Sequence, residues 1–433
     1  MRYLLAFLFL TAPCGLFAQE EITSEEIVAA LTSGQPKTAA EAIVTLKGLR
    51  NQYRVFNGTV RDAAAAYLAG IITDTAKDDD SRRKSLQDAI DLTLGSRLVK
   101  EHAVVDHVKD FYLACRQKSK ERKEERPRRT LVVGVYDGNE LSLTNLGEGP
   151  ATFNTPCHQN RVAAMRFLTE NFYYADDANK AVIEAIAYGG LEDEVEITSI
   201  AASIVPESNF MQNYAGVSRR IIHQLNTIPP INPASGQREN LLHDFEPTLV
   251  KALGSATALP NEAVTTLVER YLESRSDRQR RRYAYAIAKR KEQIKSPIGL
   301  GAEKAKRLKA ILDRSIGTEK EDLRKIENTL ILVDRRIFSE SHLTIFYPTL
   351  QRIVHLVVIQ IQHNSNGPSA YDREVGKQIL RIVSLDLPYV ERNEETKIAF
   401  GKKVTLLLHS GTYVEFLTTL LELDPQRFIH WTV

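Results

Sequence analysis

Residues 259–295, LPNEAVTTLVERYLESRSDRQRRRYAYAIAKRKEQIK, contain two consecutive stretches with the apolar spacing of α-helices. We expect these helices at 259–274 and 277–295. In the second stretch the apolar residues recur with the helical period and predict one buried stripe. The members of this stripe are Tyr283, Ala284, Ile287, Ala288 and Ile294. The two stretches therefore predict a helical hairpin.

Comparable stretches follow one another along most of the chain. After residue 157 we also expect helices at 158–173, 176–189, 192–204, 208–226, 243–254, 301–315, 319–338, 341–363, 369–386, 393–410 and 412–423. Near the N-terminus, Thr23 with Glu26 and Thr38 with Glu41 have the spacing of a capping box, which starts a helix. The later helix pairs begin at residues 243, 277, 319 and 369.

Helix pairs that recur at about 34 to 47 residues are typical of solenoids, and the arrangement resembles TPR, HEAT and armadillo arrays. The interval drifts and no residue signature recurs, so this resemblance concerns architecture alone. The sequence predicts an all-α fold: an irregular helical-hairpin (HEAT/TPR-like) α-solenoid or multi-helix array with one small β-hairpin insertion.

The β-hairpin is expected where two runs of β-prone residues, 131–136 and 140–143, flank an Asp-Gly turn. Its expected apolar face pairs Val133 and Val135 with Leu141 and Leu143. An isolated hairpin is marginally stable in water, so this one needs a surface to lie on.

Cys115 and Cys157 flank this hairpin, and they are the two cysteines that follow residue 18. A pair of cysteines in an oxidising compartment predicts one disulfide, which here would close the base of the hairpin. In the chain-entropy model a loop of this length stabilises the fold by roughly 4 kcal/mol. Two buried free thiols are one alternative, and a metal site that uses Cys157, His158 and either His107 or Cys115 is another.

The first eighteen residues have the pattern of a secretory signal peptide. Arg2 precedes the apolar run 3–10, and Ala18 supplies the small residue before a cleavage point at Gln19. A lipid anchor on Cys14 is the alternative, but Pro13 directly before it fits a lipoprotein signal poorly. The sequence therefore predicts an exported protein of the periplasm or cell envelope of a bacterium, without a transmembrane span.

The expected organisation has six parts, with the Pro-rich segment as the best boundary because proline forbids helix there. They are a signal peptide at 1–18, an N-terminal helical region at 19–130, the β-hairpin insertion at 131–157, a middle helical region at 158–226, a Pro-rich linker at 227–242 and a C-terminal helical-repeat-like region at 243–433.

The charge of the chain is balanced in total but uneven along the sequence. Its 57 Lys and Arg against 55 Asp and Glu leave a net charge of +2. Within that total, 131–274 carries 8 basic and 18 acidic residues, whereas 275–336 carries 19 basic and 9 acidic residues. An apolar fraction of 43% and a charged fraction of 26% are ordinary for a globular chain and exclude a disordered or multi-span membrane protein.

A basic face is expected on helix 277–295, opposite the buried stripe. Its predicted members are Arg278, Arg281, Arg282, Tyr285 and Lys289. Arginine offers forked donors to phosphate or carboxylate, and a tyrosine between cations can stack or make a cation–π contact. The alternatives are a solvated face and pairing with the acidic 131–274 block.

Catalytic sequence motifs are absent: there is no nucleophile elbow, zinc-protease helix, phosphate-binding loop or EF-hand loop. No cofactor or resident metal is therefore predicted. His102, Asp106 and His107 have ligand-like side chains within one turn, but a solvent-facing His–Asp pair is the simpler interpretation. The acidic run at Asp78 is interpreted as a helix cap rather than a calcium site.

These observations predict an exported, non-enzymatic helical scaffold that binds a macromolecular partner, either a protein or an anionic envelope polymer. Export argues against nucleic acid as the partner. The alternative is an envelope enzyme, such as a hydrolase, whose site assembles from His102, Asp106, His107 and Cys157 or His158.

Overall fold

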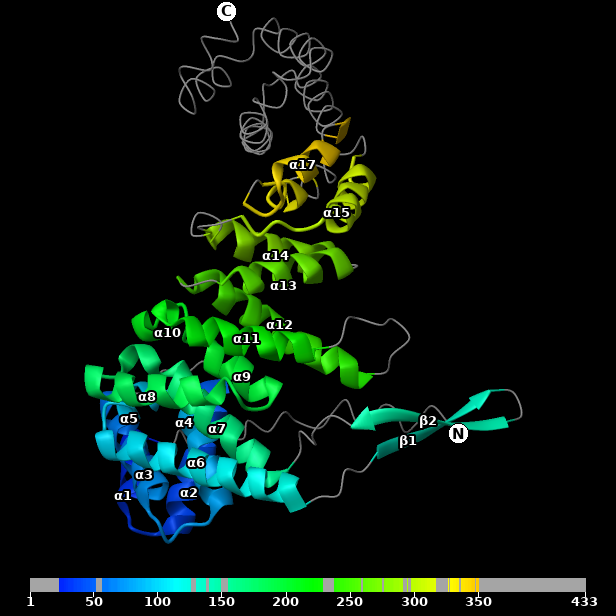
Figure 1. Ribbon diagram of the computed structural model, residues 1–433. Helices are drawn as coiled ribbons and strands as arrows, with labels where there is room; N and C mark the ends of the chain where they lie inside the picture. Colours follow the sequence, from blue (N-terminus) through cyan, green and yellow to red (C-terminus); the bar gives the residue numbers. More distant parts are fainter. Residues whose placement is uncertain are drawn as a thin grey trace, which may run out of the picture. The chain divides into compact units, whose positions relative to one another are not determined.

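The fold is seen in a computed structural model of the chain (Figure 1). The structure describes residues 23–349 except 52–56, 126–129, 138–139, 149–154, 229–236, 258–259, 275, 291–293, 295–296, 317–325, 327, 335 and 347. The predicted signal peptide, the Cys14 alternative and the helices expected after residue 349 lie outside these residues. No helix in the described part is long and apolar enough to cross a membrane.

The chain forms two compact units, unit 1 with residues 1–183 and unit 2 with residues 184–433. The boundary between them falls inside helix α8. The elements that begin in unit 1 are α1 (Ser24–Thr32), α2 (Pro36–Asn51), α3 (Gly58–Thr73), α4 (Asp79–Asp91), α5 (Gly95–Leu98), α6 (His102–Glu125), β1 (Thr130–Asp137), β2 (Glu140–Glu148), α7 (Pro156–Glu170), the 3-10 helix η1 (Phe172–Tyr174) and α8 (Asp177–Gly190).

Unit 1 is held together by α3, α4, α6 and α7. Helix α3 packs on α1, α4 and α6, and α7 packs on α4 and α6. The side chains between these helices, such as Leu68, Leu86 and Phe167, are almost completely buried. Burial of such side chains stabilises a fold by about 1.5–3 kcal/mol each.

Unit 2 is a succession of helices in which each layer contacts the next. After α8 come α9 (Val195–Ala202), α10 (Asn209–Asn213), α11 (Ala215–Thr227), α12 (Gln237–Ser255), α13 (Asn261–Glu273), α14 (Asp277–Arg290), α15 (Ala302–Arg314), α17 (Glu340–Leu343) and the 3-10 helix η3 (Thr344–Phe346). Helix α12 packs on α9, α11 and α14, α13 packs on α11, α14 and α15, and α15 packs on α17.

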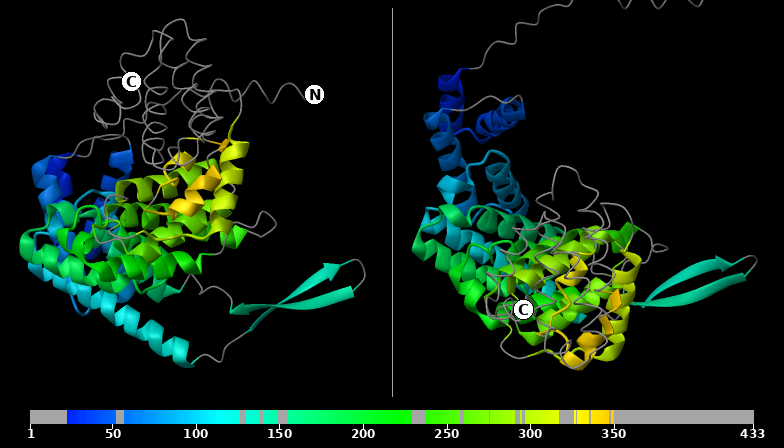
Figure 2. Two further views of the ribbon diagram at one scale, coloured as in Figure 1. Left: turned by 45° about the horizontal axis from the view of Figure 1, so that its top comes forward. Right: turned by 90° about the horizontal axis from the view of Figure 1, so that it is seen from above.

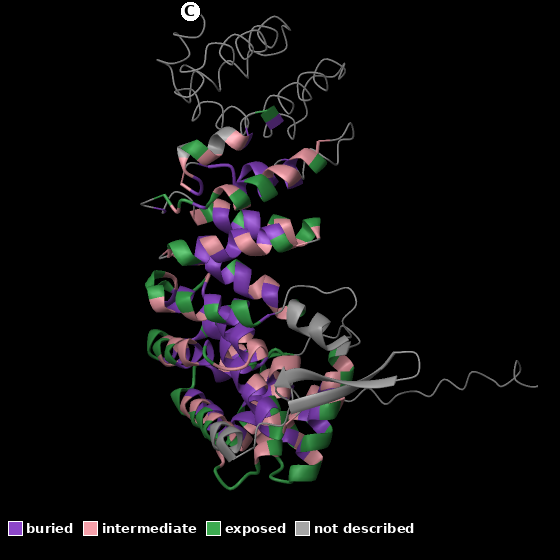
Figure 3. Ribbon diagram, turned by 45° about the vertical axis from the view of Figure 1, so that its right-hand side comes forward, coloured by how far each residue is buried: buried purple, intermediate pink, exposed green. Residues whose placement is uncertain are grey.

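Figures 1 and 2 show this stacking of α12 to α15 from three directions. The buried residues lie between the stacked helices, and the exposed ones lie on their outer faces (Figure 3). The prediction of an all-α helical-repeat array with one β-hairpin is confirmed.

Several local predictions are confirmed by the caps. Thr23 and Glu26 form the predicted capping box of α1. Asp78 caps α4, since its carboxylate accepts a hydrogen bond from the backbone N–H of Ser81 at 2.7 Å. Helix α2, in contrast, begins at Pro36 rather than at the expected cap Thr38.

The β-hairpin forms, but its register differs from the expected one. Val133 pairs with Thr144 and Val135 pairs with Ser142 in the antiparallel ladder. Residues directly opposite each other share a face of the sheet. The predicted pairing of the two valines with Leu141 and Leu143 is therefore wrong by one position.

Two boundaries also differ from the expectation. The predicted helix 208–226 is two helices, α10 and α11, because the backbone of Tyr214 between them is extended. Residues 229–236 of the predicted Pro-rich linker 227–242 lie outside the described residues, and residues 237–242 belong to α12, which packs on α11 within unit 2. The division between the units thus lies earlier in the chain than this predicted linker.

Candidate functional site

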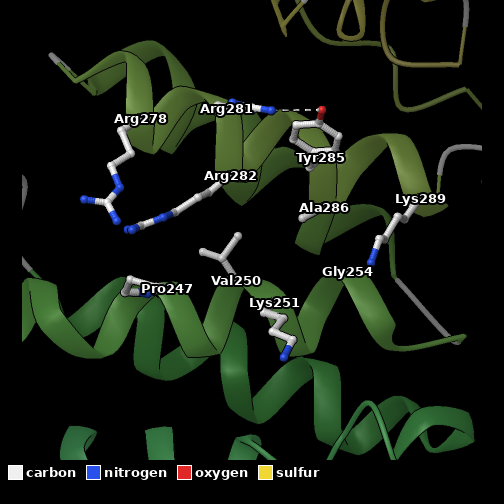
Figure 4. A pocket seen from close by; sticks show the side chains of 10 residues that line it. All are labelled: Pro247, Val250, Lys251, Gly254, Arg278, Arg281, Arg282, Tyr285, Ala286 and Lys289. Atoms are coloured by element: carbon white, nitrogen blue, oxygen red, sulfur yellow. Dashed lines mark hydrogen bonds between the residues drawn. The ribbon is translucent and has the colours of Figure 1, made fainter.

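All five residues of the predicted basic face line one pocket between α12 and α14 (Figure 4). The pocket, which we call the basic groove, has a volume of about 450 Å³. Its lining consists of Pro247, Val250, Lys251, Gly254, Arg278, Arg281, Arg282, Tyr285, Ala286 and Lys289. The lining contains no acidic residue, and the volume lies within the range of about 300–1,000 Å³ of ordinary ligand pockets.

Helix α14 turns these side chains toward the groove because its opposite face is buried. Tyr283, Ala284 and Ile287 of the predicted stripe are at most 3% exposed. Arg278, Arg282, Tyr285 and Lys289 of the groove follow one another at intervals of three or four positions, so they share the other face of the helix. Ile294 is also buried, but it lies beyond the end of α14 at Arg290.

A buried polar network behind the groove ties α14 to α12. Glu246, which directly precedes the groove residue Pro247, is 3% exposed. Its carboxylate accepts hydrogen bonds from the hydroxyl of Tyr283 and, at 3.4 Å, from the amide of Gln279. Burial raises the pKa of Tyr283, and the negative charge of Glu246 raises it further, so this phenol stays a donor.

Arg270 of α13 joins the same network. Its guanidinium lies 3.6 Å from the carboxylate of Glu246 and donates to the backbone carbonyl of Ile228 at 2.7 Å. It also donates to the carbonyl of Leu225, so it satisfies the C-terminal end of α11. The Arg270–Glu246 ion pair and its hydrogen bonds thus connect α12 and α14, which line the groove, with α11 and α13.

Near Gly254, at the end of the groove that is formed by the C-terminal part of α12, the helices α12 and α14 approach each other closely. A Cβ atom added to Gly254 would lie 3.0 Å from Cα of Ala286, which is tighter than most Cβ contacts, so a larger residue would require the two helices to shift slightly apart. Arg290 of α14 donates to the carbonyl of Gly254 at 2.9 Å and to the carbonyl of Ser255. The two helices are therefore held in register along the whole groove.

Four cations of the groove make no ion pair in the described part of the chain. They are Lys251, Arg278, Arg282 and Lys289. Arg281 lies over the ring of Tyr285, with 5.3 Å between the guanidinium carbon and the ring centroid. This contact holds a tyrosine that is 43% exposed at the rim. The groove can therefore accept negative groups without first breaking internal pairs at these four cations.

Sequence reasoning missed the α12 side of the groove. Lys251 lies in the acidic block 131–274, where a single lysine gives no signal of a basic surface. Pro247, Val250, Lys251 and Gly254 share one face of α12, but this face is identified as part of the groove only once α12 is known to pack on α14.

Two of the residues proposed for an alternative enzyme site, His102 and Asp106, contact each other on one helix. His102 pairs with Asp106 at 3.2 Å and contacts Asn179 at 2.7 Å, and its side chain is 61% exposed. His107 contacts the carbonyl of Ala103 on its own helix. Cys157 and His158 are buried on α7. Among the described residues no group of three His, Cys, Asp or Glu side chains is placed to hold a metal ion.

Cys115 and Cys157 are two free, buried thiols, not the predicted disulfide. They lie on α6 and α7, which pack on each other, and the amide of Asn160 donates to Sγ of Cys115 at 3.7 Å. Burial raises the pKa of Cys115 to about 11. The thiol therefore stays protonated at neutral pH, and the reactive thiolate is scarce.

These two thiols give a direct prediction. We expect both cysteines to react with a thiol reagent in denaturant, and Cys115 to react at least 100-fold more slowly in the folded protein at pH 7. Labelling followed by peptide mass spectrometry, without reductant, measures both. A Cys115–Cys157 cross-linked peptide as the main species would instead restore the disulfide.

Comparisons with known proteins add little to this site. No protein-family model matches the chain, and no curated protein sequence matches it. Among solved structures the chain is similar to the C-terminal fragment of the cohesin loader SCC2 from Chaetomium thermophilum, with 11% identity and a TM-score of 0.22. That match covers 93% of this chain and 35% of the fragment. The groove is therefore interpreted from its own geometry.

Proposed function

We propose that this protein is an exported, non-enzymatic helical scaffold that binds a negatively charged macromolecule in the basic groove. The observation that carries the proposal is the set of four cations, from two helices, that surround one groove without an ion pair among the described residues. Export rests on the signal-like residues 1–18 of the sequence.

Binding rather than catalysis is favoured by the character of the groove. Arg278, Arg282, Lys251 and Lys289 attract and position anions, whereas no Asp, Glu, His, Ser or Cys side chain stands in the lining as a general base or nucleophile. Arginine and tyrosine are among the side chains that contribute most at protein interfaces, and both line this groove. Helical arrays present such surfaces on a rigid scaffold.

A salt titration tests the proposal. We expect fluorescently labelled polyglutamate of about 20 residues to bind the full chain, and its affinity to fall about tenfold or more between 50 mM and 500 mM NaCl, because salt screens exposed charges. Fluorescence anisotropy measures the affinity. Absence of binding at 50 mM NaCl, or an affinity that does not change with the NaCl concentration, would contradict the proposed function.

A further inference from the structure

The basic groove has two chemically different ends. Arg278 and Arg282 lie at one end, Lys289 lies at the other, and Lys251 lies between them on the α12 side (Figure 4). On an α-helix, seven residues from Arg282 to Lys289 span about 10 Å, and eleven residues from Arg278 to Lys289 span about 16 Å. The groove therefore offers two cationic sites that are about 10 to 16 Å apart.

The floor between these ends is apolar. It is formed by Val250 and Ala286, which are 2% and 4% exposed, together with Gly254. The close approach of Gly254 to Ala286 means that no larger side chain fills this part of the floor. A polar ligand group in contact with this floor would lose its hydrogen bonds to water without gaining new ones, which costs free energy. An apolar ligand group would gain free energy there, because its surface is removed from water.

We propose that the basic groove binds an acidic protein segment in which one apolar residue lies midway between two acidic residues. The inference rests on the proposed function and specifies its partner. The first carboxylate pairs with Arg278 and Arg282, which can bind it in the bidentate manner of arginine. The apolar residue contacts Val250 and Ala286, and the second carboxylate lies between Lys251 and Lys289.

An extended peptide matches this spacing. Residues i, i+2 and i+4 of a strand point to the same side, and positions i and i+4 are about 13 Å apart. That distance falls between the two limits set by the cations of α14. The expected sequence is therefore acidic–x–apolar–x–acidic, with all three specified side chains toward the groove.

A polyanionic chain without apolar groups fits the same groove less well. Polyphosphate carries a charge at every unit, so one of its charges would be pressed onto the floor at Val250 and Ala286. Charge complementarity at the two ends, combined with an apolar centre, thus favours a protein segment over a uniform polymer.

Three peptides of equal charge test the inference, each as a competitor that displaces labelled polyglutamate from the full chain. The first contains Glu-Ser-Leu-Ser-Glu, the second Glu-Leu-Ser-Ser-Glu and the third Glu-Ser-Ser-Ser-Glu. Moving the leucine by one position turns it away from the groove. We expect the first peptide to bind about tenfold more tightly than the other two.

A double-mutant cycle assigns the second acidic position. The variant Lys251→Gln/Lys289→Gln should weaken the first peptide about tenfold. The affinity of this variant for a peptide that ends in Gln instead of the last Glu should stay within twofold of the affinity of the wild-type protein for that peptide. These lysines make no ion pair among the described residues, so we expect their replacement to change the unfolding free energy by less than about 0.5 kcal/mol. An equal loss for both peptides would contradict the placement of the second carboxylate.

The outcomes separate this inference from the proposed function. If the protein binds polyglutamate but binds all three peptides with equal affinity, the inference is overturned and the proposed function stays intact. Displacement by short polyphosphate at lower concentration than the first peptide would also overturn it. If neither polyglutamate nor any peptide binds, both the inference and the proposed function fail.

Discussion

Replacing Arg278 and Arg282 by Glu in the full chain is expected to weaken the binding of labelled polyglutamate at least 100-fold at 50 mM NaCl. A hydrogen bond to a charged group contributes about 1.5–3 kcal/mol. Loss of two such contacts therefore costs at least about 3 kcal/mol, which corresponds to about 100-fold. The introduced carboxylates also repel the ligand.

The fold is expected to survive this double replacement. Neither arginine makes an ion pair in the described part of the chain, and such surface changes usually alter stability by less than about 0.5 kcal/mol. Thermal unfolding followed by circular dichroism checks this. A loss of affinity can then be assigned to the groove rather than to unfolding.

Helix α15 provides a matched control. Lys306 and Arg307 are exposed, belong to the same basic block 275–336 and lie outside the groove lining. The variant Lys306→Glu/Arg307→Glu changes the net charge by the same amount, and we expect its affinity to stay within twofold of wild type. If both double variants lose affinity equally, the binding follows net charge and the groove has no special role.

Replacement of Glu246 by Ala is expected to cost about 3–5 kcal/mol of unfolding free energy. The change leaves the buried guanidinium of Arg270 without its carboxylate and removes the acceptor of Tyr283. Removal of one partner from a buried ion pair is costly because the other charge stays buried. Urea denaturation measures the loss.

A neighbouring residue on the same helix gives the control for this prediction. Asp244 is exposed and makes no described ion pair, so Asp244→Ala should change the unfolding free energy by less than about 0.5 kcal/mol. Glu246→Gln, which retains an acceptor for Tyr283, should lose less than Glu246→Ala. Equal stability of Glu246→Ala and Asp244→Ala would show that the network does not hold the groove together.

The helical architecture and the α14 face of the groove were predictable because both depend on local patterns. The period of Tyr283, Ala284 and Ile287 identifies the buried side of α14, and the basic residues then fall on the other side. The caps at Thr23 and Asp78 were predictable for the same reason, since a cap involves residues that are three positions apart.

The remaining features depend on contacts between distant residues. Lys251 joins the groove only because α12 packs on α14, and no spacing in the sequence encodes that contact. The pairing of Val133 with Thr144 follows from the register of the ladder, which a turn motif alone did not fix. Cys115 and Cys157 illustrate the same limit, since an even number of cysteines does not report whether their sulfurs are bonded.

The contact between Arg290 and the end of α12 has an electrostatic consequence for ligand binding. The free carbonyls at a helix C-terminus carry about half a negative charge in total. The carbonyls of Gly254 and Ser255 are at the lysine end of the groove, where such a charge would oppose an incoming carboxylate. Arg290 lies outside the groove lining, but its positive charge offsets the dipole of α12 at the lysine end. The electrostatic potential at that end therefore stays positive.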